Sequence, residues 1–153
     1  GVVSHLGIPF ERQAAAVLEG DAENPRWFSG ARLNIAQACF PGDKARVALV
    51  SGREGGAGLK RMTLGQLDAL SNRVANGLKA HGFGPGARIA LYMPMTADCV
   101  AAYLGIVKAR CAVVSVADSF SAQELEKRLA LAKADGVVTV GPFERAGRSV
   151  GLI

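Results

Sequence analysis

From residue 63 to residue 140 the sequence alternates between segments of helical periodicity and short, almost uninterrupted apolar runs. The most apolar run, residues 87–93, predicts a strand covered on both faces, because a half-exposed strand would alternate apolar and polar residues. Residues 111–116 and 136–140 predict two more buried strands. Since a helix is predicted between successive strands, we expect an α/β fold with a parallel sheet and right-handed crossovers.

Three helices are predicted around these strands. Thr63 and Gln66 form a capping-box pattern, and leucines then recur at helical spacing up to Gly82. Residues 97–109 predict the second helix, and Ser121 with Glu124 opens a third that continues through Ala132. The arrangement predicts an incomplete Rossmann-like parallel sheet with flanking helices.

The first 40 residues show weaker patterns. Residues 9–20 predict a short helix, because four apolar residues recur on one side and glycine follows. Residues 24–28 predict an irregular segment, and residues 33–40 predict another short helix. This part is expected to be an irregular, partly helical extension.

Pro41-Gly42-Asp43 marks a predicted domain boundary, because proline and glycine interrupt regular structure. We therefore expect an N-terminal extension over residues 1–40 and a main domain over residues 41–153. Within the main domain, residues 47–50 and 59–62 are strand candidates joined by a glycine-rich segment. That segment lacks a Gly-Lys-Ser/Thr ending and opens no helix, so a hairpin connection is favoured over a phosphate-binding loop.

The net charge of +5 and the pI near 9.5 are compatible with nucleic acid, anionic membrane or a polyphosphate ligand. Basic residues are interleaved with acidic ones, and no run of aromatic residues offers a stacking surface for bases. We therefore expect a solvated charged surface and no nucleic-acid partner.

The three cysteines and two histidines lie far apart in the sequence, so neither a disulfide framework, a metal site nor a catalytic histidine is predicted. No stretch reaches the apolar length of a membrane span, and the first residues lack the form of a secretion signal. The expected location is the cytoplasm.

Ligands of an open parallel sheet bind beyond the carboxyl ends of its strands. Residues 93–95, 117–121 and 141–148 follow the three predicted strands and can converge on that edge. In a helical turn, Arg145 and Arg148 would leave the same side. Each guanidinium can fork onto a phosphate or lie against an adenine ring. The simpler alternative is that the two arginines belong to the solvated surface.

Three segments, in this order and spacing, resemble the adenylate-forming ligases, most closely the acetyl-CoA synthetase branch. They are Ile89–Met95, Asp118-Ser119-Phe120-Ser121 and Arg145-Ala146-Gly147-Arg148, and the similarity extends back through Trp27–Asn34. The resemblance implies that Arg145, Ala146, Gly147 and Arg148 contribute to a coenzyme A nucleotide site.

The resemblance also implies a backbone contact with coenzyme A from the turn before Phe120, which makes Ser119 a further candidate. This family usually has a Gly-Gly pair there, whereas the present sequence has Asp118-Ser119. A side chain therefore stands where bare backbone would approach the ligand. The departure indicates a related acyl-CoA synthetase subfamily.

The resemblance implies the activity of an ATP-dependent acid-thiol ligase. Its substrates would be ATP, coenzyme A and a small carboxylic acid, with Mg²⁺ as the metal cofactor. In that family the ATP loop and the small C-terminal domain lie downstream of the matching region, so the 153-residue chain is expected to be inactive without the rest of its own chain. A targeting signal further along would make the peroxisome the alternative location. Two other functions stay open: a non-catalytic module that binds coenzyme A or a nucleotide, and a plain interaction domain.

Overall fold

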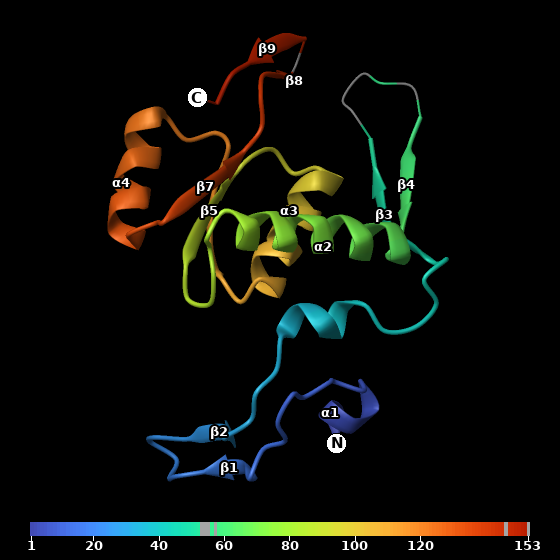
Figure 1. Ribbon diagram of the computed structural model, residues 1–153, viewed down its shortest axis with the longest axis vertical. Coiled ribbons are helices and arrows are strands. Elements are labelled where there is room, and N and C mark those ends of the chain that lie inside the picture. The colour runs from blue at the N-terminus through green and yellow to red at the C-terminus, as the bar shows by residue number, and fades with distance from the viewer. Residues whose placement is uncertain (53–55, 57, 146, 153) are drawn as a thin grey trace. The chain divides into compact units, whose positions relative to one another are not determined.

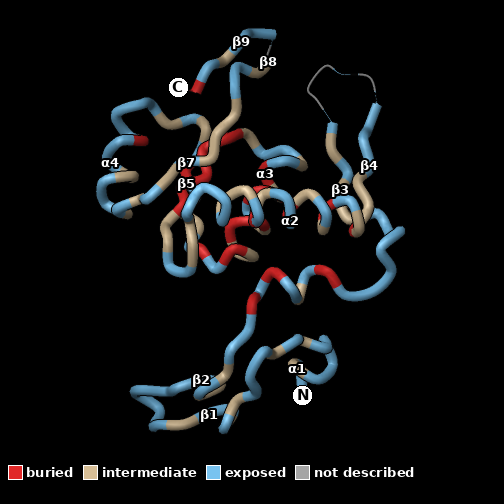
Figure 2. Tube along the Cα trace, in the orientation of Figure 1, coloured by how far each residue is buried: buried red, intermediate tan, exposed pale blue. Residues whose placement is uncertain are grey.

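The computed structural model describes residues 1–52, 56, 58–145 and 147–152. The chain divides into two compact units, Gly1–Pro41 and Gly42–Ile153, which are described separately below. Figure 1 labels most of their helices and strands, and Figure 2 shows that burial in the second unit concentrates along β5 and α3.

The second unit is built on a parallel sheet of three strands in the order β6-β5-β7. The strands are β5 (Arg88–Tyr92), β6 (Ala112–Val116) and β7 (Gly136–Thr139). Helix α3 (Ala97–Lys108) joins the first two, and α4 (Ala122–Ala132) joins β6 to β7 (Figure 1). The predicted α/β fold with a parallel sheet and flanking helices is confirmed.

Strand β5 is buried on both faces, as its apolar run predicts. Its odd-numbered residues, among them Ile89 and Leu91, pack in a cluster with residues of α2 and α3. Tyr92, on the opposite face, packs in a second cluster with Val116 and with Leu125 of α4. Helices α2 and α3 therefore cover one face of the sheet, and α4 covers the other.

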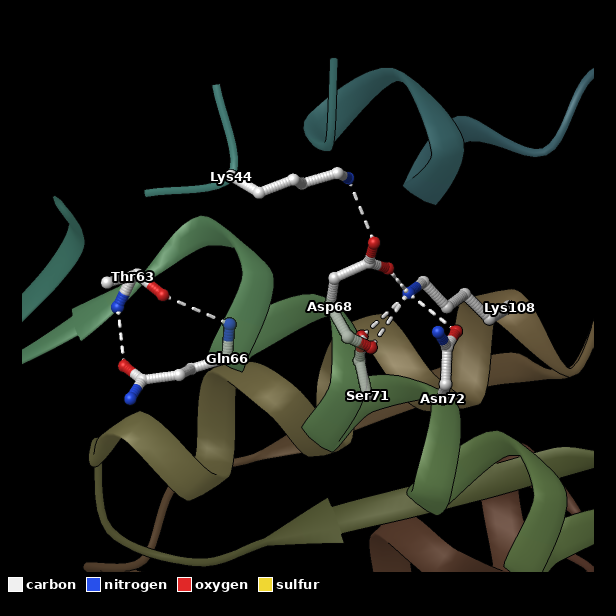
Figure 3. Close-up of polar contacts among 7 residues, drawn as sticks. All are labelled: Lys44, Thr63, Gln66, Asp68, Ser71, Asn72 and Lys108. Carbon is white, nitrogen blue, oxygen red and sulfur yellow. Dashed lines mark hydrogen bonds and ion pairs between the residues drawn. The ribbon is translucent and has the colours of Figure 1, made fainter. Parts of the chain in front are cut away.

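An antiparallel hairpin precedes the sheet. It consists of β3 (Val47–Ser51) and β4 (Lys60–Thr63), which confirms the predicted hairpin. β4 leads into α2 (Leu64–Ala80) through a capping box: Thr63 Oγ1 accepts from Gln66 N at 3.2 Å, and Gln66 Oε1 accepts from Thr63 N at 2.8 Å (Figure 3). Both capping boxes predicted from the sequence are present, the second at Ser121 and Glu124.

Helices α2 and α3 approach closely at Gly105. A Cβ atom placed on this glycine would lie 2.5 Å from Val74 Cβ and 2.8 Å from the carbonyl oxygen of Ser71. Real atoms do not approach so closely, and the second contact is with rigid backbone. Glycine is therefore what allows the two helices to pack at this distance.

A polar cluster lies beside this crossing and joins the same two helices (Figure 3). Lys108 Nζ, on a side chain only 12% exposed, donates to Asp68 Oδ1 at 2.6 Å, to Ser71 Oγ at 2.8 Å and to Asn72 Oδ1 at 2.8 Å. Lys44 Nζ reaches the other Asp68 oxygen at 2.9 Å. The hydrogen bond from Lys108 lowers the pKa of Asp68, and Lys44 adds to this against the opposing effect of burial.

The first unit differs from its sequence-based prediction. Residues 9–20 were expected to be helical, but β1 (Ala16–Glu19) pairs with β2 (Arg26–Ser29) in an antiparallel ribbon, and a short helix, α1, covers Val2–His5. Gly20 turns the chain at φ 85°, where a Cβ would meet the Asn24 carbonyl oxygen. The prediction was wrong because the strand is stabilised by pairing with a segment about ten residues away. The spacing of apolar residues within residues 9–20 carries no information about that pairing.

The predicted irregular segment at residues 24–28 was also partly wrong, since β2 begins at Arg26. The helix expected over residues 33–40 is present as a 3₁₀ helix, Ile35–Cys39. Asn34 caps this helix: its Oδ1 accepts from Ala36 N at 3.1 Å.

The crossing at Gly105 predicts that Gly105→Ala lowers the free energy of unfolding by about 1–3 kcal/mol, because the added methyl group forces the helices apart. Gly77→Ala is the matched control. It lies in α2 with no described atom within 4 Å of its Cβ position, and should leave stability unchanged or raise it by up to about 1 kcal/mol. Thermal and urea melts compare the two. Equal effects would contradict close packing at Gly105.

The lowered pKa of Asp68 predicts a stabilisation that depends on pH. A carboxylate with a depressed pKa in the folded state stabilises the fold above its ordinary pKa, and that contribution is lost as the pH falls through the folded value. Asp68→Asn should therefore cost about 1.5–3 kcal/mol at pH 7, and the difference from wild type should shrink below about pH 4. Glu126→Gln, which removes a negative charge at an exposed position of α4, is the control. A difference that persists unchanged into acid would be evidence against the ion pair.

Candidate functional site

The carboxyl ends of the three parallel strands meet at one edge of the sheet. Tyr92, the last residue of β5, is in register with Val116, the last residue of β6, and with Thr139, the last residue of β7. Residues 93–95, 117–121 and 141–148 therefore leave the sheet from the same edge, as expected from the sequence.

The turn at residues 117–121 is well braced. Its own backbone closes it, with Phe120 N donating to the carbonyl oxygen of Ala117 at 3.1 Å. From β5, Tyr92 Oη donates to the Phe120 carbonyl oxygen at 2.7 Å. Ser121 then caps α4, and Phe120 and Leu125 belong to the same apolar cluster, as in a hydrophobic staple. Ser119 is exposed on this turn.

Asp118, which stands where the ligase family usually has glycine, is partly buried. After desolvation by burial, its negative charge is among the causes that raise the pKa of Cys99. Cys99 lies in the first turn of α3, whose N-cap is Thr96. The charge of Asp118 therefore affects the electrostatic environment at the start of α3.

Arg145 and Arg148 lie in the strands of a β-hairpin, so the condition of a helical turn, under which both would leave the same side, is not met. Strand β8 (Phe143–Arg145) pairs with β9 (Arg148–Val150) (Figure 1). The register places Arg145 directly opposite Arg148. The register continues with Glu144 opposite Ser149 and Phe143 opposite Val150. Gly147 has φ 70° in the tight turn, and Ala146 lies outside the described residues.

One apolar cluster connects the hairpin to the turn. It contains Tyr92, Val116, Leu125 and Leu152 in its buried part, with Phe120, Phe143 and Val150 packed against it. The structure therefore attaches the two predicted site segments to the same cluster. Arg148 is exposed, two cross-strand pairs beyond the anchoring Phe143–Val150 pair.

Sequence reasoning missed Arg128 at this site. Its guanidinium carbon lies 3.8 Å from the centroid of the Phe120 ring, and Nη1 donates to the Glu124 carbonyl oxygen at 3.4 Å. The signal was an aromatic residue just before a helix and an arginine eight positions later, which two turns of α4 bring onto the same side. The hydrogen bond from Tyr92 to this turn was not foreseen either.

Within the described ranges, no three His, Cys, Asp or Glu side chains form a cluster that could hold a metal ion. In the same residues no helix has the length and apolar character needed to cross a membrane.

Comparison with known proteins assigns the family. A sequence model described as AMP-binding enzyme matches residues 37–151. The chain belongs to this family. Among curated relatives it is 37% identical to probable acyl-activating enzyme 18, peroxisomal, of Arabidopsis thaliana, over 96% of this chain and 21% of that protein. It is 34% identical to the acetyl-coenzyme A synthetase of Thiobacillus denitrificans, over 88% of this chain and 21% of that protein.

A solved structure agrees with the sequence relatives. The acetoacetyl-CoA synthetase from Streptomyces lividans superimposes with a TM-score of 0.87 at 25% identity, over 98% of this chain and 24% of that one. The resemblance to adenylate-forming acyl-CoA synthetases inferred from the sequence is confirmed. The chain spans about a fifth to a quarter of the length of these proteins.

The hairpin geometry predicts that Gly147→Ala destabilises the β8–β9 turn by about 1–2 kcal/mol, because alanine is strained at this positive φ. Gly151→Ala is the matched control. Neither glycine has a described atom within 4 Å of its Cβ position, and Gly151 has no left-handed φ. Amide hydrogen exchange of residues 143–150 measures the effect. If the two variants exchange alike, the tight turn is not required.

Proposed function

We propose that this chain forms part of an ATP-dependent acyl-CoA synthetase and contributes to its coenzyme A nucleotide site. The carrying observation is the register that opposes Arg145 and Arg148 on a hairpin anchored to the same apolar cluster as the Phe120 turn. Family membership supplies the reaction class, since relatives named as acetyl-CoA and hexanoyl-CoA synthetases match nearly the whole chain.

Two arginines at opposed positions suit a phosphorylated adenosine. A guanidinium offers paired N–H donors to phosphate oxygens and a flat face to an adenine ring, which a lysine ammonium does not. Gly147, which precedes Arg148, has no side chain to obstruct a ligand, and Ser119 would supply backbone from the turn before Phe120. Ala146, named with these residues from the family resemblance, is retained in the proposed site.

The proposed reaction has two steps. The substrate carboxylate attacks the α-phosphate of ATP, so that an acyl-adenylate forms and pyrophosphate leaves. The thiol of coenzyme A then attacks the acyl carbon, the thioester forms, AMP leaves and the thiol proton is lost to solvent or a base. Mg²⁺ would offset phosphate charge in the first step. The residues proposed for the coenzyme A site would serve only the second step. The chain alone is proposed to catalyse neither step.

The division of the chain supports a domain assignment. We assign residues 1–40 to an extension of the acetyl-CoA synthetase type and residues 41–153 to the first part of the large AMP-binding domain. The break between compact units after Pro41 and the family match from residue 37 support this boundary. The proposed location is the cytoplasm, and the peroxisomal names of two relatives support the peroxisome as the alternative.

The first test measures both half-reactions in the native protein that carries this sequence. ATP–pyrophosphate exchange with short carboxylic acids reports adenylate formation, and thioester formation reports transfer to coenzyme A. Activity in both supports the proposal. Coenzyme A binding without exchange would instead support a non-catalytic binding module, and neither activity nor binding would support an interaction domain.

The second test concerns the arginines. In the native-length protein, Arg145→Ala with Arg148→Ala should raise KM for coenzyme A by at least about tenfold, because charge-assisted hydrogen bonds to phosphate are lost. ATP–pyrophosphate exchange needs no coenzyme A and should be retained. Arg73→Ala removes a positive charge at an exposed position of α2 and serves as the control. An unchanged KM for coenzyme A in the double variant would overturn the proposed site.

A further inference from the structure

The Phe120 turn is held from two different elements. Its backbone is held by β5, where Tyr92 donates its hydroxyl to the Phe120 carbonyl oxygen at 2.7 Å. Tyr92 is 2% exposed, so this hydroxyl is fixed by the packing of its own ring. Its side chain is held by α4, where the Arg128 guanidinium lies 3.8 Å from the ring centroid.

These two contacts act on different parts of one residue. The hydrogen bond from Tyr92 holds the peptide group, and the apolar cluster that contains Leu125 packs against the ring. Arg128 restricts the ring, and cation–π contacts of this kind contribute about 0.5–1 kcal/mol at exposed sites. With both contacts present, the exposed Ser119 immediately before Phe120 has a fixed backbone position.

Arg128 is itself oriented by the helix. Its Nη1 donates to the carbonyl oxygen of Glu124, one turn earlier in α4, and Glu124 also completes the capping box with Ser121. The cap, the guanidinium and the ring are thus linked within the first two turns of α4. These contacts join the start of the helix to the turn that precedes it.

We propose that Arg128 is a positioning residue for the coenzyme A step, acting through Phe120 to fix the Ser119 turn beside the β8–β9 hairpin. This inference rests on the proposed function. It assigns Arg128 no contact with the ligand. A turn that must order itself when the nucleotide binds loses part of the binding free energy to that ordering, and a turn already held in place does not.

The test uses the native-length protein and steady-state kinetics of thioester formation. Arg128→Met keeps an unbranched, apolar stem and removes the guanidinium. It should raise KM for coenzyme A about two- to fivefold, the range that 0.5–1 kcal/mol corresponds to. ATP–pyrophosphate exchange should be retained. Lys127→Met removes the same charge from the neighbouring, exposed position of α4 and is the matched control.

A double-mutant cycle separates positioning from direct contact. If Arg128 acts through the ring, Arg128→Met should have no further effect on KM for coenzyme A in a Phe120→Leu background. If Arg128 touched a phosphate itself, its replacement would raise KM equally in both backgrounds and would flatten the salt dependence of KM. That second result would overturn the proposal.

A merely structural role predicts a different pattern. Both half-reactions would fall together with the melting temperature, and that outcome would also overturn the proposal. The arginine variants of the hairpin keep the two proposals distinguishable. If Arg145→Ala with Arg148→Ala raises KM for coenzyme A and Arg128→Met does not, only the role of Arg128 fails. If neither does, the site itself is wrong.

Discussion

The close packing of α2 on α3 at Gly105 is the constraint on which the second unit depends. At this crossing the backbone of α2 comes within van der Waals distance of α3, and Lys108, one turn further along, joins the helices through Asp68. Lys108 is a partly buried cation that is paired with the Asp68 carboxylate and also donates to the Ser71 hydroxyl, so the cost of its desolvation is offset. With this pair of helices fixed, one face of β5 is covered, and the carboxyl edge of the sheet has a defined position.

The elements that could be predicted from the sequence are those encoded by neighbouring residues. Thr63 with Gln66 and Ser121 with Glu124 specify helix starts within four residues, and both capping boxes form. The uninterrupted apolar run at β5 specifies a strand with no wet face, and the structure buries it on both sides. Since such signals alternate through the second unit, the α/β class followed from sequence alone.

Pairing between distant segments explains what the sequence did not reveal. Strand β1 was mistaken for part of a helix and the start of β2 for an irregular segment, and the strand pair that carries Arg145 and Arg148 was not foreseen. In both cases the deciding hydrogen bonds join strands across a turn, and the local pattern is too short to reveal its period. The contacts of Lys108 and Arg128 could not be predicted for the same reason. Lys108 meets Asp68 only when α3 packs against α2, and Arg128 meets Phe120 only when α4 forms after the turn. The sequence indicated which residues could bind a ligand, but it did not indicate how those residues are arranged in space.

The alternation of β5 between two clusters has a consequence for how this protein tolerates change in length. Residue 91 belongs to the cluster shared with α2 and α3, whereas residue 92 belongs to the cluster shared with α4 and the hairpin. Losing or gaining a single residue within Arg88–Tyr92 would exchange the two sets and carry the Tyr92 hydroxyl to the wrong side of the sheet. Insertions and deletions should therefore be excluded from this strand during evolution, and variation in length should collect in the connections on either side of it.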